Sequence, residues 1–245
     1  MGVPTTLVAL ELTLRAEHDP ARQGHIAHLA GRLGYQAVWL PVDPATEPDP
    51  ATLDLLAIEA DPARLGLVVG DAVDTVSQWL AGAGDALVEI GTTAMVPDRA
   101  VLVEAVGGAV DWRARVRTTD LDLAAAGFVV HAASREAAAA ELTKAREARA
   151  AAGLTGAEFP LVVALPVAIG RTMSEAVARA LRDPALGAEH DPRLAGLFGR
   201  LEDAQEQALA LAAAGADVIR ATLADEADVV DLLAKLRPVA VGPTP

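Results

Sequence analysis

A helix, a glycine and a short apolar strand follow one another at four places in the chain, and this repeat restricts the fold more than any other feature. The first copy is Leu29–Pro41 (LAGRLGYQAVWLP), and the others are Trp79–Thr93, Leu123–Ser134 and Leu209–Thr222. Glycine ends a helix well because it enters the left-handed conformation without a steric penalty from a Cβ atom. The apolar, β-branched run behind it is typical of a strand covered on both faces. The repeat therefore predicts a parallel α/β fold.

Eight strands are expected, alternating with helices at a spacing of about 30 residues. The predicted strands are Thr5–Leu14, Gln36–Leu40, Arg64–Gly70, Asp85–Ile90, Val110–Val116, Gly127–His131, Phe159–Ile169 and Asp217–Ala221. Asp19 is the predicted N-cap of the first helix, with Pro20 at its first position; Ser134 is predicted to cap a helix to Ala152, and Thr172 or Ser174 a helix through Leu181. The other predicted helices cover Ala51–Ala60, Ala72–Ala81, Pro97–Val106, Leu121–Ala126, Leu194–Ala214 and Ala227–Leu236. This pattern predicts a (β/α)8 TIM barrel that residues 1–245 form as a single domain. An open doubly wound sheet is the alternative, and it is less favoured because no glycine-rich dinucleotide fingerprint follows the first strand.

Composition excludes several classes of partner. The net charge is −14 and aromatic residues make up 3% of the chain, which disfavours nucleic acid and anionic membrane surfaces. The chain has no cysteine, so disulfides, thiolate metal sites and cysteine nucleophiles are excluded. The start, MGVPTTLVALELTL, has no basic region and carries Glu11 in its apolar run, and no stretch reaches the roughly 18–20 apolar residues of a membrane span. We expect a soluble, cytoplasmic protein.

Four blocks of sequence share a further pattern: Leu29–Pro41 with its Gly-Tyr pair and tryptophan, the proline-led helix and strand of Asp49–Gly70, the block Gly127–Ala180, and Leu209–Val239. Taken in order, these blocks resemble the luciferase-like monooxygenase family of flavin- and deazaflavin-dependent TIM-barrel oxidoreductases. The resemblance implies an oxidoreductase or monooxygenase that acts on a small molecule with FMN or the deazaflavin coenzyme. It also implies a homodimer formed through the early helices.

The chain departs from the family pattern at three places. Val42 and Asp43 stand where an acidic residue and a histidine are common, Ala81–Asp85 has no arginine, and the segment between Thr93 and Val110 is short. These departures keep a second hypothesis open, in which a barrel without cofactor or catalysis serves as a partner subunit or binds a small ligand.

Ligands of a barrel bind at the carboxyl ends of the strands, and polar residues there are the candidates. Arg171 and Thr172 follow the seventh strand and could bind the phosphate of a flavin through a basic side chain and helix N–H groups, with Arg220 of the eighth strand nearby. The alternative for Arg171 is a solvated loop arginine. Gly107 and Gly108 resemble a family glycine pair near the cofactor phosphate.

The titratable residues inside or at the ends of strands give three further expectations. His131 ends the sixth strand and is the candidate acid, base or hydrogen-bond donor, with a structural histidine as the alternative. Glu11 and Glu89 lie within strands, where a buried carboxylate needs a partner; Arg113 and Arg115 could pair with Glu89, in an interior ion pair or in a ligand site. His25 and His28 lack a third ligand of suitable spacing, so no metal site is expected.

Overall fold

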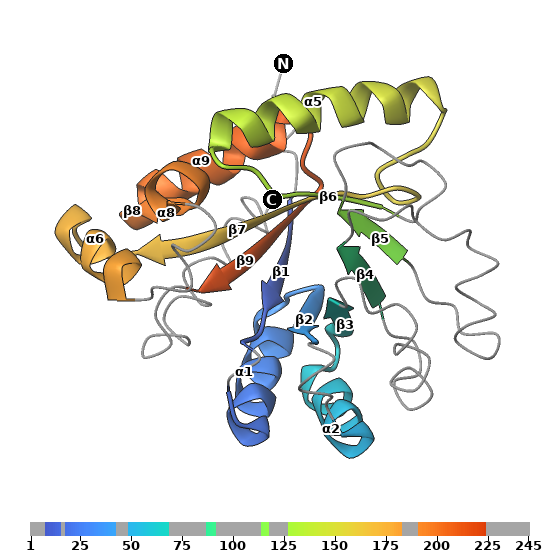
Figure 1. Ribbon diagram of the computed structural model, residues 1–245, viewed down its shortest axis with the longest axis vertical. Helices are drawn as coiled ribbons and strands as arrows, with labels where there is room; N and C mark the ends of the chain where they lie inside the picture. The colour runs from blue at the N-terminus through green and yellow to red at the C-terminus, as the bar shows by residue number, and fades with distance from the viewer. Residues whose placement is uncertain are drawn as a thin grey trace, which may run out of the picture. The chain divides into compact units, whose positions relative to one another are not determined.

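The computed structural model describes residues 8–15, 18–42, 49–68, 87–91, 114–117, 127–182 and 191–223 (Figure 1). The chain divides into two compact units. The first consists of Met1–Glu11, Val130–Gly156 and Pro160–Pro245, and the second of Leu12–Val129 and Ala157–Phe159. The boundary falls within two strands, β1 (Ala9–Thr13) and β6 (Phe128–Val130), so each of these strands contributes to both units.

The second unit is a parallel α/β arrangement. Its strands β2 (Ala37–Pro41), β3 (Arg64–Val68), β4 (Leu87–Gly91), β5 (Ala114–Arg117) and the start of β6 pair in that order, all parallel. The backbone register places Glu89 opposite Arg115. This register agrees with the predicted pairing of the two residues, and it concerns the backbone alone.

Two helices of the second unit, α1 (Pro20–Leu33) and α2 (Pro50–Ala60), lie side by side (Figure 1). The Asp19 carboxylate caps α1 by accepting from the Arg22 N–H at 3.0 Å, and Pro20 occupies the first helical position. Gly34 ends the helix in the left-handed region, with φ of +87°. These three features are the ones that the sequence predicted for this helix.

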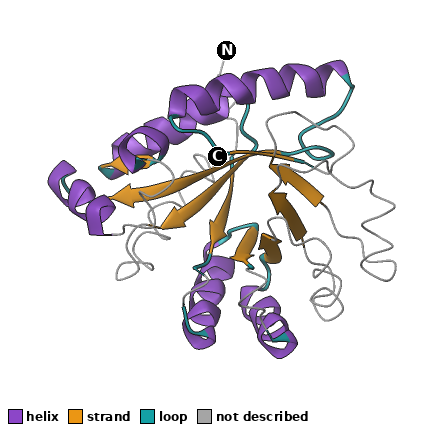
Figure 2. Cartoon of the chain, in the orientation of Figure 1, coloured by secondary structure: helices purple, strands orange, loops and turns teal. Residues whose placement is uncertain are grey.

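The first unit is also built on parallel strands. Here β9 (Val218–Leu223), β7 (Leu161–Ile169) and β8 (Leu197–Gly199) pair in that order, and the Ala9 N–H of β1 donates to the Asp217 carbonyl just before β9. The helices are α5 (Arg135–Ala151), α6 (Met173–Arg182), α8 (Pro192–Ala195) and α9 (Leu201–Ala214) (Figure 2). Strand β7 is buried along most of its length, as expected for the centre of a covered sheet.

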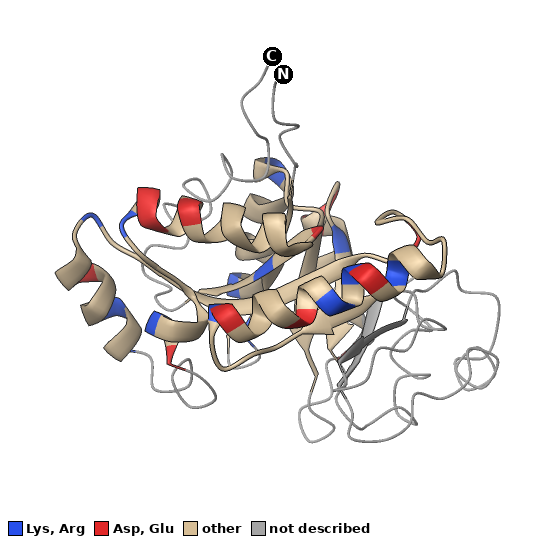
Figure 3. Cartoon of the chain, turned by 90° about the horizontal axis from the view of Figure 1, so that it is seen from above, with Lys and Arg blue, Asp and Glu red and all other residues tan. Residues whose placement is uncertain are grey.

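Helices α5 and α9 pack together in the first unit. Leu142 of α5 and Leu211 of α9 are buried, and the Arg146 guanidinium donates to the Ala213 carbonyl at 3.1 Å. The outer side of α5 carries charges of both signs (Figure 3). At the end of α5, Arg149 forms an ion pair with Asp217, whose carboxylate also accepts from the Leu161 N–H at 2.8 Å. These contacts anchor α5 to the starts of β7 and β9.

The parallel α/β fold predicted from the sequence is confirmed, and one predicted helix is wrong. In place of a continuous helix over Leu194–Ala214, the chain forms α8, then β8, then α9. Gly199 has φ of +117°, which a helix cannot contain, and β8 gains its hydrogen bonds from β7, far away in the sequence. The predicted helices Ala72–Ala81, Pro97–Val106, Leu121–Ala126 and Ala227–Leu236 lie outside the described residues. Closure of the strands into a (β/α)8 barrel stays a prediction.

None of the helices in the described ranges is both long and apolar enough to cross a membrane.

Candidate functional site

Strands β7 and β8 end side by side, and a helix starts directly after each of them. The register pairs Ile169 with Gly199, and the Gly170 N–H donates to the Gly199 carbonyl at 2.9 Å. Residues 170–173 then lead into α6, and residues 199–203 lead into α9. We call these two segments the β7–β8 edge. It lies at the carboxyl ends of the strands, where ligands of α/β proteins bind.

The start of α6 is closed by its own side chains. The Thr172 hydroxyl accepts from the Glu175 N–H at 3.2 Å, and Glu175 Oε2 accepts from the Arg171 N–H at 2.7 Å. Glu175 Oε1 accepts from the guanidinium of Arg179, a buried residue, at 2.8 Å. The hydrogen bond from Arg179, followed by that from the Arg171 backbone, holds the pKa of Glu175 below its usual value. Glu175 is therefore ionised at neutral pH.

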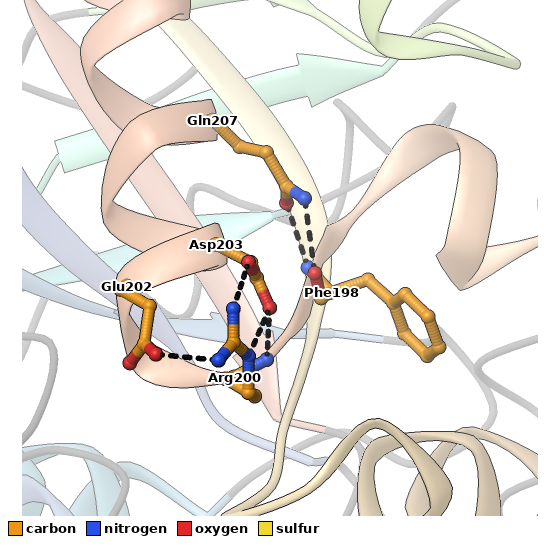
Figure 4. A network of polar contacts seen from close by, with 5 residues as sticks. All are labelled: Phe198, Arg200, Glu202, Asp203 and Gln207. Atoms are coloured by element: carbon orange, nitrogen blue, oxygen red, sulfur yellow. Dashed lines mark hydrogen bonds and ion pairs between the residues drawn. The ribbon is translucent and has the colours of Figure 1, made fainter.

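The start of α9 is closed in the same way (Figure 4). Asp203 accepts from the Arg200 N–H at 2.9 Å and from the Arg200 Nε at 3.1 Å, while Glu202 pairs with the Arg200 Nη1 at 2.9 Å. The hydrogen bonds from Arg200 lower the pKa of Asp203, and those to Asp203 raise the pKa of Arg200. The two carboxylates and the guanidinium thus carry one net negative charge.

Gln207 of α9 fixes the position of β8. Its side-chain oxygen accepts from the Phe198 N–H, and its side-chain nitrogen donates to the Phe198 carbonyl, both at 2.9 Å (Figure 4). The amide therefore satisfies the backbone of the middle residue of this three-residue strand. A second clamp comes from Arg135 at the start of α5, which donates to the carbonyls of Arg193 and Gly196.

The two glycines of the edge have no open space above them. A Cβ atom on Gly170 would lie 2.6 Å from the Ala176 nitrogen and 2.8 Å from the Glu175 Cβ. On Gly199 it would lie 3.0 Å from an Asp203 carboxylate oxygen. The first turns of α6 and α9 fill this space, whereas a phosphate cradle keeps its glycine backbone open to the ligand.

The predicted site residues lie in different environments. Arg171 and Thr172 are both at the β7–β8 edge and are exposed, and among the described residues no carboxylate is within ion-pair distance of the Arg171 guanidinium. Arg220 is not at the strand end. It lies opposite Ala164 within the sheet, and its Nε is 3.3 Å from Glu11 Oε2.

The remaining candidates lie elsewhere. His131 directly follows β6 and is half-buried. Gly107 and Gly108 are outside the described residues. His28 lies 3.3 Å from Glu59 on the exposed surface of α1 and α2, and the part of the chain that the structure describes holds no set of three residues able to bind a metal ion.

Sequence reasoning missed the residues that shape the edge, namely Glu175, Arg200, Asp203 and Gln207. The Thr-x-x-Glu spacing of Thr172 and Glu175 is a capping-box signature and could have revealed the first of them. Asp203 is three residues after Arg200, but this pair becomes visible only once the helix start is known.

The residues of the β7–β8 edge do not fit a cofactor phosphate. Phosphate at a helix start binds to N–H groups that have no other acceptor, with positive charge nearby. Here the N–H groups of Arg171 and Arg200 donate to carboxylates of the same edge. Glu175 and Asp203 would also repel an anion. We therefore assign no cofactor phosphate to this edge.

Comparisons with known proteins support the fold of the chain. No family model matches the chain, and no curated protein matches it either. Solved structures do match over nearly the whole chain, at low identity. The family resemblance seen in the sequence is thereby confirmed at the level of the fold.

Three of these structures illustrate the range of TM-score and sequence identity. The coenzyme F420-dependent tetrahydromethanopterin reductase from Methanopyrus kandleri has a TM-score of 0.71 at 12% identity, with 96% of this chain and 99% of that chain covered. An F420-dependent secondary alcohol dehydrogenase, in complex with an F420-acetone adduct, has a TM-score of 0.72 at 11% identity, covering 96% and 100%. Monooxygenase RslO1 from Streptomyces bottropensis has a TM-score of 0.63 at 16% identity, covering 94% and 98%.

Proposed function

We propose that this chain is a luciferase-like oxidoreductase or monooxygenase that closes into a (β/α)8 barrel and acts on a small molecule with FMN or the deazaflavin coenzyme. The observation that supports it is structural similarity over 96% of the chain to an F420-dependent reductase and an F420-dependent dehydrogenase. Because identity is only 11–12%, the similarity supports the class and leaves the substrate open.

His131 is the proposed catalytic residue of this function. It directly follows β6, so it lies at the end of a strand where barrel enzymes place reacting groups. An imidazole changes its protonation state near neutral pH and can therefore exchange a proton with a substrate. Of the predicted cofactor residues, Arg171 and Thr172 are exposed at the β7–β8 edge, which does not fit a phosphate, and Gly107 and Gly108 remain proposals.

A second candidate function is a barrel without catalysis that serves as a partner subunit or binds a small ligand. The observation that favours it is the chemistry of the β7–β8 edge, where Glu175 and Asp203 accept from the backbone N–H groups that a phosphate would use. Arg220, the other predicted cation, is paired with Glu11 in the interior. Two of the predicted phosphate contacts are thus already engaged within the protein.

Cofactor titration separates the two candidates. The purified chain is titrated with FMN and, separately, with coenzyme F420, while the fluorescence of its three tryptophans and the cofactor absorbance are recorded. The oxidoreductase proposal expects saturable quenching by one cofactor, and a His131→Gln variant that keeps this binding but loses turnover. A protein that binds neither cofactor at high micromolar concentration supports the second candidate and contradicts the first.

We also propose that two copies of the chain associate through α1 and α2. A groove of about 340 Å³ between these helices is lined by Ala21, Gly24, His25, His28, Leu55 and Glu59. On α2, Leu55, which lines the groove, is 42% exposed, and Ile58, three residues further along the helix, is 72% exposed. An apolar ridge next to a groove with small residues on the same face is self-complementary, as a two-fold interface requires.

Light scattering should show a dimer that Ile58→Lys converts to a monomer; a wild-type monomer contradicts this proposal.

A further inference from the structure

The β7–β8 edge has the backbone layout of an anion site but not its chemistry. Two parallel strands end together, and two helices of ten and fourteen residues start there. The positive ends of two helix dipoles ordinarily attract phosphate or sulfate. In this chain, carboxylates of the protein itself occupy the positive ends of these two helices.

Each helix start is satisfied by a carboxylate from its own first turn. Glu175 accepts from the Arg171 N–H at 2.7 Å, and Asp203 accepts from the Arg200 N–H at 2.9 Å. Both acids are also bonded to guanidinium groups, Glu175 to Arg179 and Asp203 to Arg200. A phosphate would have to displace a carboxylate that is anchored on two sides.

Steric crowding acts in the same direction. The space beside Gly170 is filled by the first turn of α6, with the Glu175 Cβ 2.8 Å from a Cβ built on the glycine. The space beside Gly199 is filled by Asp203 and by Met173 of α6, whose methyl carbon would lie 3.3 Å from such a Cβ. The backbone that could approach an anion is covered.

We propose that Glu175 and Asp203 are specificity-determining residues that exclude phosphate-bearing groups from the β7–β8 edge. The edge carries three arginines, Arg171, Arg179 and Arg200, and three carboxylates, those of Glu175, Glu202 and Asp203, so it presents no net excess of positive charge. A ligand that reaches this edge meets it with a part that carries no negative charge. The inference holds for either candidate function, because it concerns the edge itself.

The test uses inorganic phosphate as the probe and the backbone amide signals of residues 170–173 and 199–203 as the readout, recorded by 15N-edited NMR on the full chain. In the wild type we expect no saturable shift of these signals. In the double variant Glu175→Ala/Asp203→Ala the N–H groups of Arg171 and Arg200 lose their side-chain acceptors, and two negative charges are removed. We expect that variant to bind phosphate at these amides at least about tenfold more tightly than the wild type, the scale of effect from removing like charges next to a partly exposed site.

Glu202→Gln is the matched control. Glu202 belongs to the same helix turn and pairs with Arg200, but no helix-start N–H among those described donates to it, so its variant removes a charge without opening a donor. We expect it to behave like the wild type. Thermal unfolding curves of all variants check that the double variant is folded. If it is not, the same phosphate titration is carried out on each single variant, in which only one carboxylate is removed.

Two results would overturn the proposal. One is saturable phosphate binding by the wild type at these amides with a dissociation constant below about 1 mM, which is the affinity of a working anion site at a helix start. The other is a folded double variant with no gain in phosphate binding, because the carboxylates would then not be the barrier. Neither result depends on whether the chain binds FMN or coenzyme F420, so failure here and failure of the oxidoreductase proposal remain distinct.

Discussion

The ion pair of Glu11 and Arg220 permits a quantitative prediction about the interior of the first unit. The side chains are 1% and 2% exposed, and Arg220 Nε lies 3.3 Å from Glu11 Oε2. Glu11→Leu removes the carboxylate and leaves the guanidinium buried in the same place. Breaking a buried pair from one side costs about 3–5 kcal/mol, because the remaining charge keeps its desolvation penalty and loses the attraction of this partner.

The assay is urea unfolding followed by far-UV circular dichroism. With a slope of about 3 kcal/mol per molar urea, the midpoint of Glu11→Leu should fall by roughly 1–1.7 M. The double variant Glu11→Leu/Arg220→Met should recover most of this loss, since an apolar pair of similar volume replaces a buried ion pair at little or no cost. Glu202→Gln, which breaks an exposed pair with Arg200, should cost less than about 1 kcal/mol.

The reasoning is refuted if Glu11→Leu unfolds within about 1 kcal/mol of the wild type, because a pair that costs so little to break is not compensating a buried charge. It is also refuted if the double variant is no more stable than the single one. The same variants bear on function. If Arg220 serves as a cofactor residue, Arg220→Met in the folded double variant should weaken FMN or F420 binding; if its role is structural, binding should be unchanged.

Three further predictions concern single side chains. Gln207→Leu should lower stability by about 2–4 kcal/mol in urea unfolding, because the Phe198 N–H and carbonyl both lose their partner, and a variant within error of wild type would contradict this. Gly34→Ala should cost about 1–2 kcal/mol purely from backbone strain at φ +87°, since no atom lies within 4 Å of the added Cβ, and Gly34→Asn should cost less. The pKa of Glu175 is lowered in the folded state below the unfolded value of 4.5, so its stabilisation is complete above pH 4.5 and is lost as the pH falls through the folded pKa. Melting temperatures measured from pH 7 to pH 3 should therefore fall less steeply for Glu175→Gln than for the wild type, and parallel curves would count against the assignment.

Local signals in the sequence predicted the elements that local contacts determine. Asp19 with Pro20 fixes the start of α1 and Gly34 fixes its end, and Ser134 caps α5 through the Ala137 N–H as predicted. Thr172 is the predicted cap of α6. In each case the residues that decide the boundary lie within four positions of it, so a window of sequence contains the cause.

Elements stabilised by distant partners could not be predicted in this way. The segment LAGLFGR reads as part of an apolar helix, yet Leu197–Gly199 forms a strand because β7 supplies its hydrogen bonds and Gln207 supplies two more. Glu11 was expected to need a partner, but its partner Arg220 is 209 residues away in the sequence. The residues next to Arg220 in the sequence do not indicate whether its guanidinium pairs with a carboxylate of the interior or contacts a ligand.

Because contacts with distant residues cannot be read from the sequence, the sequence suggests more cations for a phosphate site than the structure leaves available. A sequence shows how many arginines follow the strands, but phosphate binding requires arginines and N–H groups that are not already engaged. In the described structure Arg220 pairs with Glu11, Arg200 pairs with Glu202 and Asp203, and the Arg171 N–H donates to Glu175. The Arg171 guanidinium is what remains for an anion at this edge, beside a carboxylate that opposes it. Similarity of fold to an F420-dependent reductase therefore assigns no phosphate contact to the β7–β8 edge, and the chemistry of this chain has to be tested at His131 and with the cofactors themselves.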